Sequence, residues 1–263
     1  MKLRYLISFV FIAGFCLAVA GCSGLPHAAG GADLMAPQDT PENLRILLVS
    51  AEDALAEKEY ESALRLYGDI LAQGAVGATA SWALMRRGRI YLEQENFSKA
   101  VKELKGVPRR GEDDGIYDEA QYLLARSYAG MKMFGATEGI VRKLEKDVKD
   151  PGRTAELEML MGDALAGQGR YLGAVASYMN VFEGGAATDF RMRAKEKTER
   201  IIARSLSIEQ LEKLREMYEN SDFYPSILCA LVSSYEKKKN DAKAGYYNDV
   251  LRARHPGYTC ADS

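Results

Sequence analysis

The stretch that decides the fold runs from Ala80 to Pro108 and reads ASWALMRRGRIYLEQENFSKAVKELKGVP. Its apolar residues recur at helical spacing, which predicts one helix from about Ala80 to Gln94 and a second from about Ser98 to Lys105. Pro108 marks the exit, because proline cannot continue a helix. The stretch therefore predicts a hairpin of two amphipathic helices joined by a tight turn.

This hairpin is one copy of a unit that repeats every 37 residues. Four columns keep that step over four copies: a small residue, an aromatic residue, a second small residue and a larger side chain. The columns are Ala51, Gly88, Ala125 and Gly162; Tyr60, Phe97, Phe134 and Tyr171; Ala63, Ala100, Thr137 and Ala174; and Tyr67, Leu104, Val141 and Tyr178. We expect the small residues where the two helices cross closely, and the aromatic residue as a wedge between successive hairpins. A fixed period of this length indicates a repeat architecture.

Two further copies continue the series with a weaker signal. Copy five keeps the step at Ile208 and Leu211, but the segment from Asp189 to Arg204 is heavily charged, so we interpret it as a degenerate repeat. The sixth copy carries Leu228, Leu231, Tyr235, Ala244 and Leu251, and Pro256 closes it. Terminal repeats of a solenoid are expected to be atypical. The sequence thus predicts an all-α, right-handed solenoid of about six helix hairpins over residues 42–257, with a tail at 258–263.

The unit resembles the tetratricopeptide repeat, whose helix pairs carry small residues at the crossings and a proline after the second helix. The usual period of that repeat is about 34 residues. We expect the extra residues of each copy to lengthen the loops between repeats. The resemblance covers nearly all of residues 42–257 and is strongest in the first four copies.

The N-terminus is predicted to be a targeting signal that is removed from the mature protein. An apolar run from Leu6 to Ala20 is shorter than the roughly 20 residues of a membrane span, and basic residues precede it, so it has the form of a secretory signal. Val-Ala-Gly before Cys22 resembles the lipobox of bacterial lipoproteins. That resemblance implies removal of residues 1–21, acylation of Cys22 and, because Ser23 follows, delivery to the outer membrane, facing the periplasm. A plain cleaved secretion signal is the alternative.

Residues 22–41 are mostly Gly, Ala, Pro and polar residues, with few side chains that can pack. Such a composition behaves as a flexible tether. We therefore expect a folded body held to the membrane by a lipid anchor and a loose linker.

The composition excludes several classes of chemistry. Thirty-five Lys plus Arg against 37 Asp plus Glu leaves no basic excess for a nucleic acid partner. The two histidines, His27 and His255, lie near no Cys at metal-ligand spacing. The acidic run at 112–114 lacks further ligands, and the glycines at 167–173 lack the spacing of a dinucleotide site. We expect no catalysis, no cofactor, no metal and no small-molecule substrate.

Cysteine usage leaves one question open. If Cys16 leaves with the signal and Cys22 is acylated, Cys229 and Cys260 remain, and in an oxidising periplasm two remaining cysteines often pair. Such a bridge would stabilise the last repeat by roughly 3–4 kcal/mol in the chain-entropy account. The alternative is a buried free Cys229 with a loose tail.

The concave face, lined mainly by the first helix of each pair, is the predicted binding surface. Its next column, Glu52, Arg89, Arg126, Asp163 and Arg200, should line up as a charged ladder. Together with nearby apolar residues it suggests a groove for an extended or helical peptide with carboxylates. The predicted partner-binding residues are Trp82, Met85, Arg89, Tyr122, Arg126, Met159 and Asp163. The alternative is that the ladder charges pair with one another as a solvated stripe.

These features favour a non-catalytic, outer-membrane-anchored adaptor that binds another envelope protein. The chain resembles the helical N-terminal part of penicillin-binding-protein activators, lipoproteins that stimulate peptidoglycan synthases. The lipobox, the hairpin series, the segment Ser205–Leu214 and the run Arg254-His-Pro-Gly-Tyr258 carry that resemblance, which implies regulation of peptidoglycan synthesis. Those activators continue into a periplasmic-binding-protein-like domain that this sequence does not include. The alternatives are a component of the outer-membrane β-barrel assembly machinery, a pilus or secretion-system lipoprotein, and a peptidoglycan-binding protein.

Overall fold

The computed structural model describes residues 35–111, 114–148 and 150–260, which form twelve helices and no strand. The first helices of the six hairpins are α1 (Glu42–Ala56), α3 (Gly77–Glu93), α5 (Gly115–Gly130), α7 (Pro151–Gly167), α9 (Thr188–Arg204) and α11 (Tyr224–Lys237). The second helices are α2 (Tyr60–Ala72), α4 (Phe97–Lys105), α6 (Phe134–Leu144), α8 (Tyr171–Glu183), α10 (Ile208–Met217) and α12 (Asp241–Arg254). The predicted all-α solenoid of helix hairpins is confirmed.

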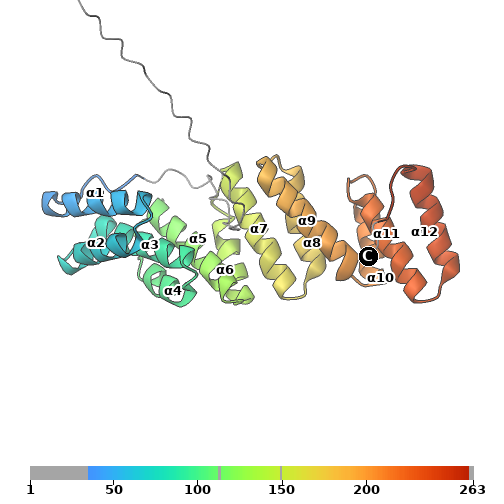
Figure 1. Cartoon of the computed structure of the whole chain (residues 1–263), viewed down its shortest axis with the longest axis horizontal. Coiled ribbons are helices and arrows are strands. Elements are labelled where there is room, and N and C mark those ends of the chain that lie inside the picture. The colour runs from blue at the N-terminus through green and yellow to red at the C-terminus, as the bar shows by residue number, and fades with distance from the viewer. Residues whose placement is uncertain (1–34, 112–113, 149, 261–263) are drawn as a thin grey trace, which may run out of the picture.

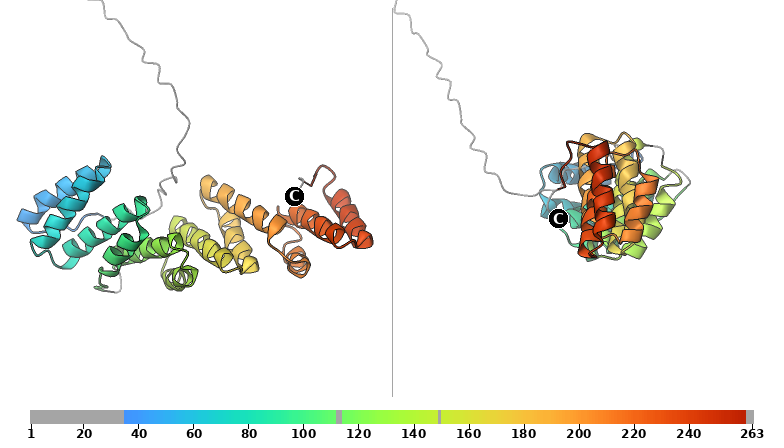
Figure 2. Two further views of the ribbon diagram at one scale, coloured as in Figure 1. Left: turned by 60° about the horizontal axis from the view of Figure 1, so that its bottom comes forward. Right: turned by 90° about the vertical axis from the view of Figure 1, so that its right-hand side faces the viewer.

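The hairpins stack along one axis, which makes the molecule long and narrow (Figure 1). The stack is bowed, and α1 and α9 lie nearer the inside of the bow than α2 and α10 (Figure 2, left). We call the surface that the first helices α1, α3, α5, α7, α9 and α11 present on that side the inner face. Because each hairpin packs mainly against its neighbours, the core is a thin layer shared along the stack.

The small residues of the repeat lie where the two helices of a hairpin cross. A methyl group on Gly88 would lie 2.5 Å from Cδ2 of Leu104, and one on Gly162 would lie 2.7 Å from Cδ1 of Tyr178. Both distances are shorter than any real Cβ contact, and both opposing side chains are buried. Glycine therefore stands where the side chain across the hairpin is long.

The aromatic column packs between successive hairpins, as expected. A methyl group on Gly130, the last residue of α5, would lie 2.5 Å from Cζ of Phe97 at the start of α4. One on Gly167, the last residue of α7, would lie 2.5 Å from Cδ2 of Phe134 at the start of α6. In each case the aromatic ring of one repeat packs directly on a glycine of the next repeat. This contact between the ring and the glycine backbone sets the distance between the two hairpins.

The turn inside the hairpins has a repeated backbone conformation that no residue type marks. Lys58, Glu95, Lys132 and Gly169 stand 37 residues apart, and their φ angles are 61°, 56°, 59° and 73°. A residue in this left-handed conformation commonly ends a helix, and it is usually glycine or asparagine. Only the fourth copy uses glycine. In the other three copies a residue with a side chain adopts a left-handed conformation that glycine adopts more easily.

Copy five forms a hairpin in spite of its charge. On α9, Ala194, Thr198 and Ile202 are buried, so one side of the helix still faces the core. Ser207 then starts α10 with a capping box, in which its hydroxyl accepts from the backbone N–H of Gln210 and the side chain of Gln210 accepts from the backbone N–H of Ser207. The degenerate repeat keeps its apolar side and its helix start.

The end of the predicted tether is packed, which differs from the expectation of a loose linker through residue 41. Thr40 is buried, and its hydroxyl lies 3.2 Å from that of Thr79 on α3. Specific packing of a few residues against the first hairpins outweighs the composition here. Residues 1–34, with the predicted signal peptide and Cys22, lie outside the described residues.

Candidate functional site

Charged side chains on the inner face join the successive first helices from α1 to α9. The pairs are Glu52–Arg86 between α1 and α3 (2.8 Å), Arg89–Glu119 between α3 and α5 (2.6 Å), Glu119–Arg153 between α5 and α7, and Asp163–Lys197 between α7 and α9. Three members of the predicted ladder take part, but each pairs with a residue from another column. Glu52, Arg89 and Asp163 therefore tie neighbouring repeats together and do not pair with one another, whereas Arg200 pairs with Glu196 on its own helix and Arg126 forms no ion pair with a described residue.

Glu52 is the centre of the first tie. Its Oε1 accepts hydrogen bonds from the hydroxyl of Tyr67 (2.7 Å), from Nε1 of Trp82 (2.6 Å) and from Nε of Arg86 (3.1 Å). Burial, together with this carboxylate, raises the pKa of Tyr67 far above its usual value. One carboxylate thus joins α1, α2 and α3.

The middle of the inner face holds a largely buried cluster on α5 and α7. The guanidinium of Arg153 pairs with Glu119 and lies 2.9 Å from Glu156, and both carboxylates are buried. The same guanidinium stacks 4.0 Å from the ring of Tyr122, and that of Arg126 lies 5.7 Å from it. Burial, then the charge of Glu156, raises the pKa of Tyr122 to about 12, and burial raises the pKa of Glu156. Within this cluster, Arg126 alone has no ion-pair partner among the described residues.

Four of the predicted partner-binding side chains belong to the core. Trp82, Met85, Tyr122 and Met159 are 1%, 0%, 8% and 4% exposed. We expected them to line an open groove, but all four are buried in the core that the repeats share. The predicted groove is therefore wrong for these four residues, whose large side chains fill the space between repeats.

The three remaining predicted residues differ in whether their charges are already paired within the chain. Arg89 is committed to Glu119, and Asp163 accepts from Lys197 and, at 2.6 Å, from the hydroxyl of Tyr178. Arg126 is partly exposed and engaged through the Tyr122 ring. A partner-binding role for the three residues stays a prediction, and Arg126 is the one with a charge still available for an ion pair.

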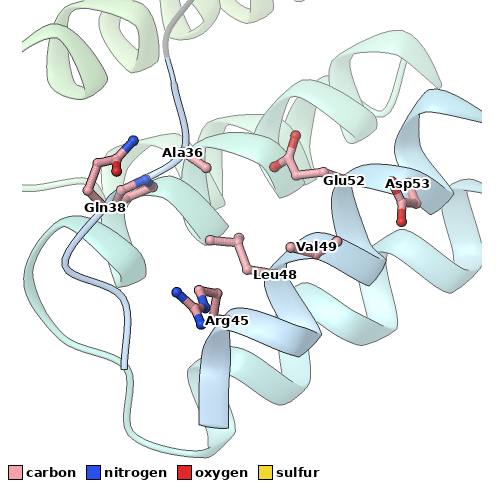
Figure 3. Close-up of a pocket in the computed structure, with 8 residues that line it drawn as sticks. Ala36, Gln38, Arg45, Leu48, Val49, Glu52 and Asp53 are labelled. Carbon is pink, nitrogen blue, oxygen red and sulfur yellow. The ribbon is translucent and has the colours of Figure 1, made fainter. Parts of the chain in front are cut away.

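A pocket of about 300 Å³ lies between α1 and residues 35–40, which we call the strap (Figure 3). Its lining is Ala36, Pro37 and Gln38 from the strap, and Arg45, Leu48, Val49, Glu52 and Asp53 from α1. Arg45 and Asp53 stand toward opposite ends, and Leu48 and Val49 lie between them (Figure 3). This site was not predicted, because a segment with so few large side chains shows no sign of packing in the sequence.

The tail folds back onto α11. Of the two alternatives left open for the cysteines, the structure has the bridge: Cys229 and Cys260 form a disulfide with their Cα atoms 5.5 Å apart. The hydroxyls of Ser226 and Tyr258 lie 2.9 Å from each other. Residues 258–260, the described part of the tail, are therefore held against the first helix of the last hairpin.

Within the described ranges, no group of three or more His, Cys, Asp or Glu side chains is arranged to hold a metal ion. In the same ranges, no helix combines the length and the apolar character needed to cross a bilayer. The last residue of the acidic run at 112–114 has a structural role, since Asp114 caps α5 by accepting from the backbone N–H of Tyr117 at 3.2 Å. The other two residues of that run lie outside the described part.

A family model supports the repeat in part of the chain. The family described as tetratricopeptide repeat matches residues 54–127, from the end of α1 into α5. No curated protein matches the chain. Among solved structures, the chain is similar to one titled "Crystal Structure of P58(IPK) TPR Domain at 2.5 A", with 17% identity and a TM-score of 0.34 over 81% of this chain. The match covers 61% of that chain, less than two thirds of its length.

Proposed function

We propose that this protein is a non-catalytic adaptor of the bacterial envelope, which binds another envelope protein through the inner face of its solenoid. Solenoids of stacked helix pairs use their extended concave surfaces for binding. The match to the tetratricopeptide repeat and the stacked hairpins support this general role. Anchoring at the outer membrane through a lipid on Cys22, facing the periplasm, is the finer part of the proposal and rests on the lipobox resemblance.

The observation that carries the binding proposal is the state of Arg126. Its neighbours in the central cluster form ion pairs, whereas its own guanidinium lies against the ring of Tyr122 and pairs with no described carboxylate. An arginine braced by an aromatic ring loses little freedom when it meets a carboxylate or a backbone carbonyl. Arginine and tyrosine are also enriched among the residues that dominate interface energies. We therefore place the centre of the partner surface at Arg126.

The test is capture of a partner in intact envelopes, with a photo-crosslinking amino acid on the exposed part of α5 and with charge-reversal variants. Arg126→Glu should weaken capture by about 30-fold, as expected for an interface residue worth roughly 2 kcal/mol. Arg65→Glu is the matched control, because Arg65 is an exposed cation on α2, away from the inner face. Equal capture by both variants would refute a partner surface centred on Arg126.

The anchoring proposal has a separate test. In cells given a clickable fatty acid, Cys22→Ala should abolish labelling and release the protein from the membrane fraction. Cys16→Ala should label normally, because Cys16 lies within the predicted signal. Labelling that persists in Cys22→Ala would show that the lipobox resemblance misleads.

Regulation of peptidoglycan synthesis is the finest level of the proposal, and it rests on the resemblance to penicillin-binding-protein activators. Crosslinked partners identified as peptidoglycan synthases would support it, whereas components of the β-barrel assembly machinery would favour that alternative. Sedimentation with purified sacculi separates both from direct wall binding. Strong retention without any other protein would replace the adaptor with a peptidoglycan-binding protein.

A further inference from the structure

The strap lies against α1 of the first hairpin and makes a turn at Gln38 and Asp39. Ala36 packs against the core, Pro37 and Gln38 cover α1, and Glu52 lies both in the wall of the pocket and in the first inter-repeat tie (Figure 3). The strap therefore occupies part of the surface that a partner of the solenoid would use.

The tail covers equivalent positions at the other end of the stack. Counted back from the buried alanine of the second helix, the covered residues stand 18 and 15 positions earlier in both hairpins: Arg45 and Leu48 before Ala63, and Ser226 and Cys229 before Ala244. The same two register positions of the first and last hairpins thus lie beside the chain's own segments: Leu48 is buried, whereas Arg45 lines the pocket and remains exposed.

The two segments are held by different means. The tail is joined covalently to α11 by the disulfide. The strap is held to the solenoid by the hydroxyl of Thr40, which lies 3.2 Å from that of Thr79, and by the small contact of Ala36. Within the strap, the same hydroxyl donates to the carbonyl of Pro37 at 2.7 Å. Beside it remains the space of about 300 Å³, and Met35 is 76% exposed. The C-terminal cover is fixed, whereas the N-terminal cover can leave without breaking a covalent bond.

We propose that the strap is a displaceable internal ligand, and that the surface beneath it binds a short segment of a partner protein with the same turn in its place. The seated strap shows the chemistry that this surface accepts: a small apolar residue, a proline and, three positions later, a hydroxyl that reaches Thr79. The space beside Ala36 takes a larger apolar side chain than alanine, so a partner segment with leucine there fills it better. The inference rests on the proposed function, in which the inner face binds a protein.

The experiment uses the full chain and a fluorescent peptide of residues 35–41, Met-Ala-Pro-Gln-Asp-Thr-Pro, as the probe. In the wild type the strap competes with the peptide, which lowers the apparent affinity by the fraction of molecules that are open. Thr40→Val removes both contacts of the hydroxyl, and Ala36→Asp opposes seating of the strap by a second route. Thr154→Val is the matched control, because Thr154 makes a similar hydroxyl-to-carbonyl bond at the start of α7. Hydrogen exchange of residues 35–40 reports whether the strap has left.

We expect Thr40→Val and Ala36→Asp to exchange faster over the strap and to bind the peptide at least tenfold more tightly than the wild type or Thr154→Val. A peptide with leucine in place of Ala36 should bind several-fold more tightly still, and a scrambled peptide should not bind. Emission of Trp82, which shares Glu52 with the pocket, should shift on release and return on binding.

Three results would overturn the proposal: a strap that stays protected in both variants, a strap that leaves without any gain in peptide binding, or pairing of two copies through exchanged straps. Arg126→Glu should leave binding of this peptide unchanged, because Arg126 lies on α5 and the strap covers α1. If the strap variants gain no peptide binding but Arg126→Glu loses partner capture, only the strap inference is rejected. If the strap variants bind the peptide more tightly but Arg126→Glu captures the partner normally, only the partner surface at Arg126 is rejected.

Discussion

The close crossing of the helices in the fourth hairpin predicts that Gly162→Ala destabilises the protein, although alanine is the better helix former. The added methyl group would lie 2.7 and 2.8 Å from Cδ1 and Cζ of Tyr178. Cε1 of the same ring lies closer still, so the ring would have to withdraw by about 1 Å to reach the distance at which ordinary contact begins. It is 2% exposed, and its hydroxyl is held by Asp163 at 2.6 Å. The ring therefore has little room to move.

Two opposing terms set the magnitude. Overpacking a filled site costs about 1–3 kcal/mol, and replacing glycine by alanine inside a helix gains up to about 1 kcal/mol. We expect a net loss of roughly 1–2 kcal/mol. Gly139→Ala is the matched control on α6, where a methyl group meets nothing within 4 Å, so that variant should gain about 0.5–1 kcal/mol.

A third variant separates steric conflict from other causes. The equivalent pair of the third hairpin is Ala125 with Val141, so Gly162→Ala combined with Tyr178→Val copies a natural solution. Tyr178→Val alone should cost about 2–4 kcal/mol through the lost ring and hydroxyl. The double variant should lose less than the sum of the two single losses, because the smaller side chain makes room for the methyl group.

The assay is urea unfolding followed by far-ultraviolet circular dichroism, with hydrogen exchange of α7 and α8 as a local readout, because a repeat array need not unfold in one step. Gly162→Ala and Gly139→Ala should move the transition in opposite directions. If both variants gain the same stability, or if the double variant shows strict additivity, the steric account of this crossing is refuted.

Three further predictions test other contacts. Glu52→Ala leaves the indole N–H of Trp82 without its acceptor, so it should cost about 2–4 kcal/mol and shift Trp82 emission to longer wavelength; unchanged emission would contradict the hydrogen-bonded hub. Hydrogen bonds from Gln168, Arg142 and Arg170 lower the pKa of Glu138 to about 2, below about 4.3 in an unfolded chain. The stability from these bonds is thus present above about pH 4.3 and lost as the pH falls toward 2, and Glu138→Gln should flatten the pH dependence of urea unfolding in that window. Replacing Cys229 and Cys260 with serine should cost the last hairpin about 3–4 kcal/mol in the chain-entropy account, seen as faster hydrogen exchange in α12; protection equal to that of the wild type would mean that packing alone holds the tail.

The repeat itself was predictable because its determinants are local. The ring of Phe97 against Gly130, and the side chain of Leu104 across from Gly88, are contacts within a hairpin or between neighbours. They recur at one spacing, so a single sequence displays them as columns. The fold class, the number of hairpins and the crossing points follow from this periodicity, and the structure agrees with all three.

The surface was predicted less well, because side-chain exposure depends on how neighbouring repeats are rotated against each other. Trp82 and Met159 were predicted to line the groove, yet the packing between repeats buries both. The partner of each ladder charge is set in the same way: Asp163 meets Lys197 rather than Arg200 because of the offset between α7 and α9. No column of the sequence contains that offset.

By itself, the sequence determined the helical-repeat architecture, because each repeat must bury an apolar side against the next and the period records where. Only the tertiary structure decided which side chains remain available on the inner face, and that the strap and the tail cover equivalent positions on α1 and α11. Those outcomes depend on contacts between segments far apart in the chain, such as Thr40 with Thr79 and Cys229 with Cys260. Their free energies depend on three-dimensional proximity, which a local pattern of residue types does not encode.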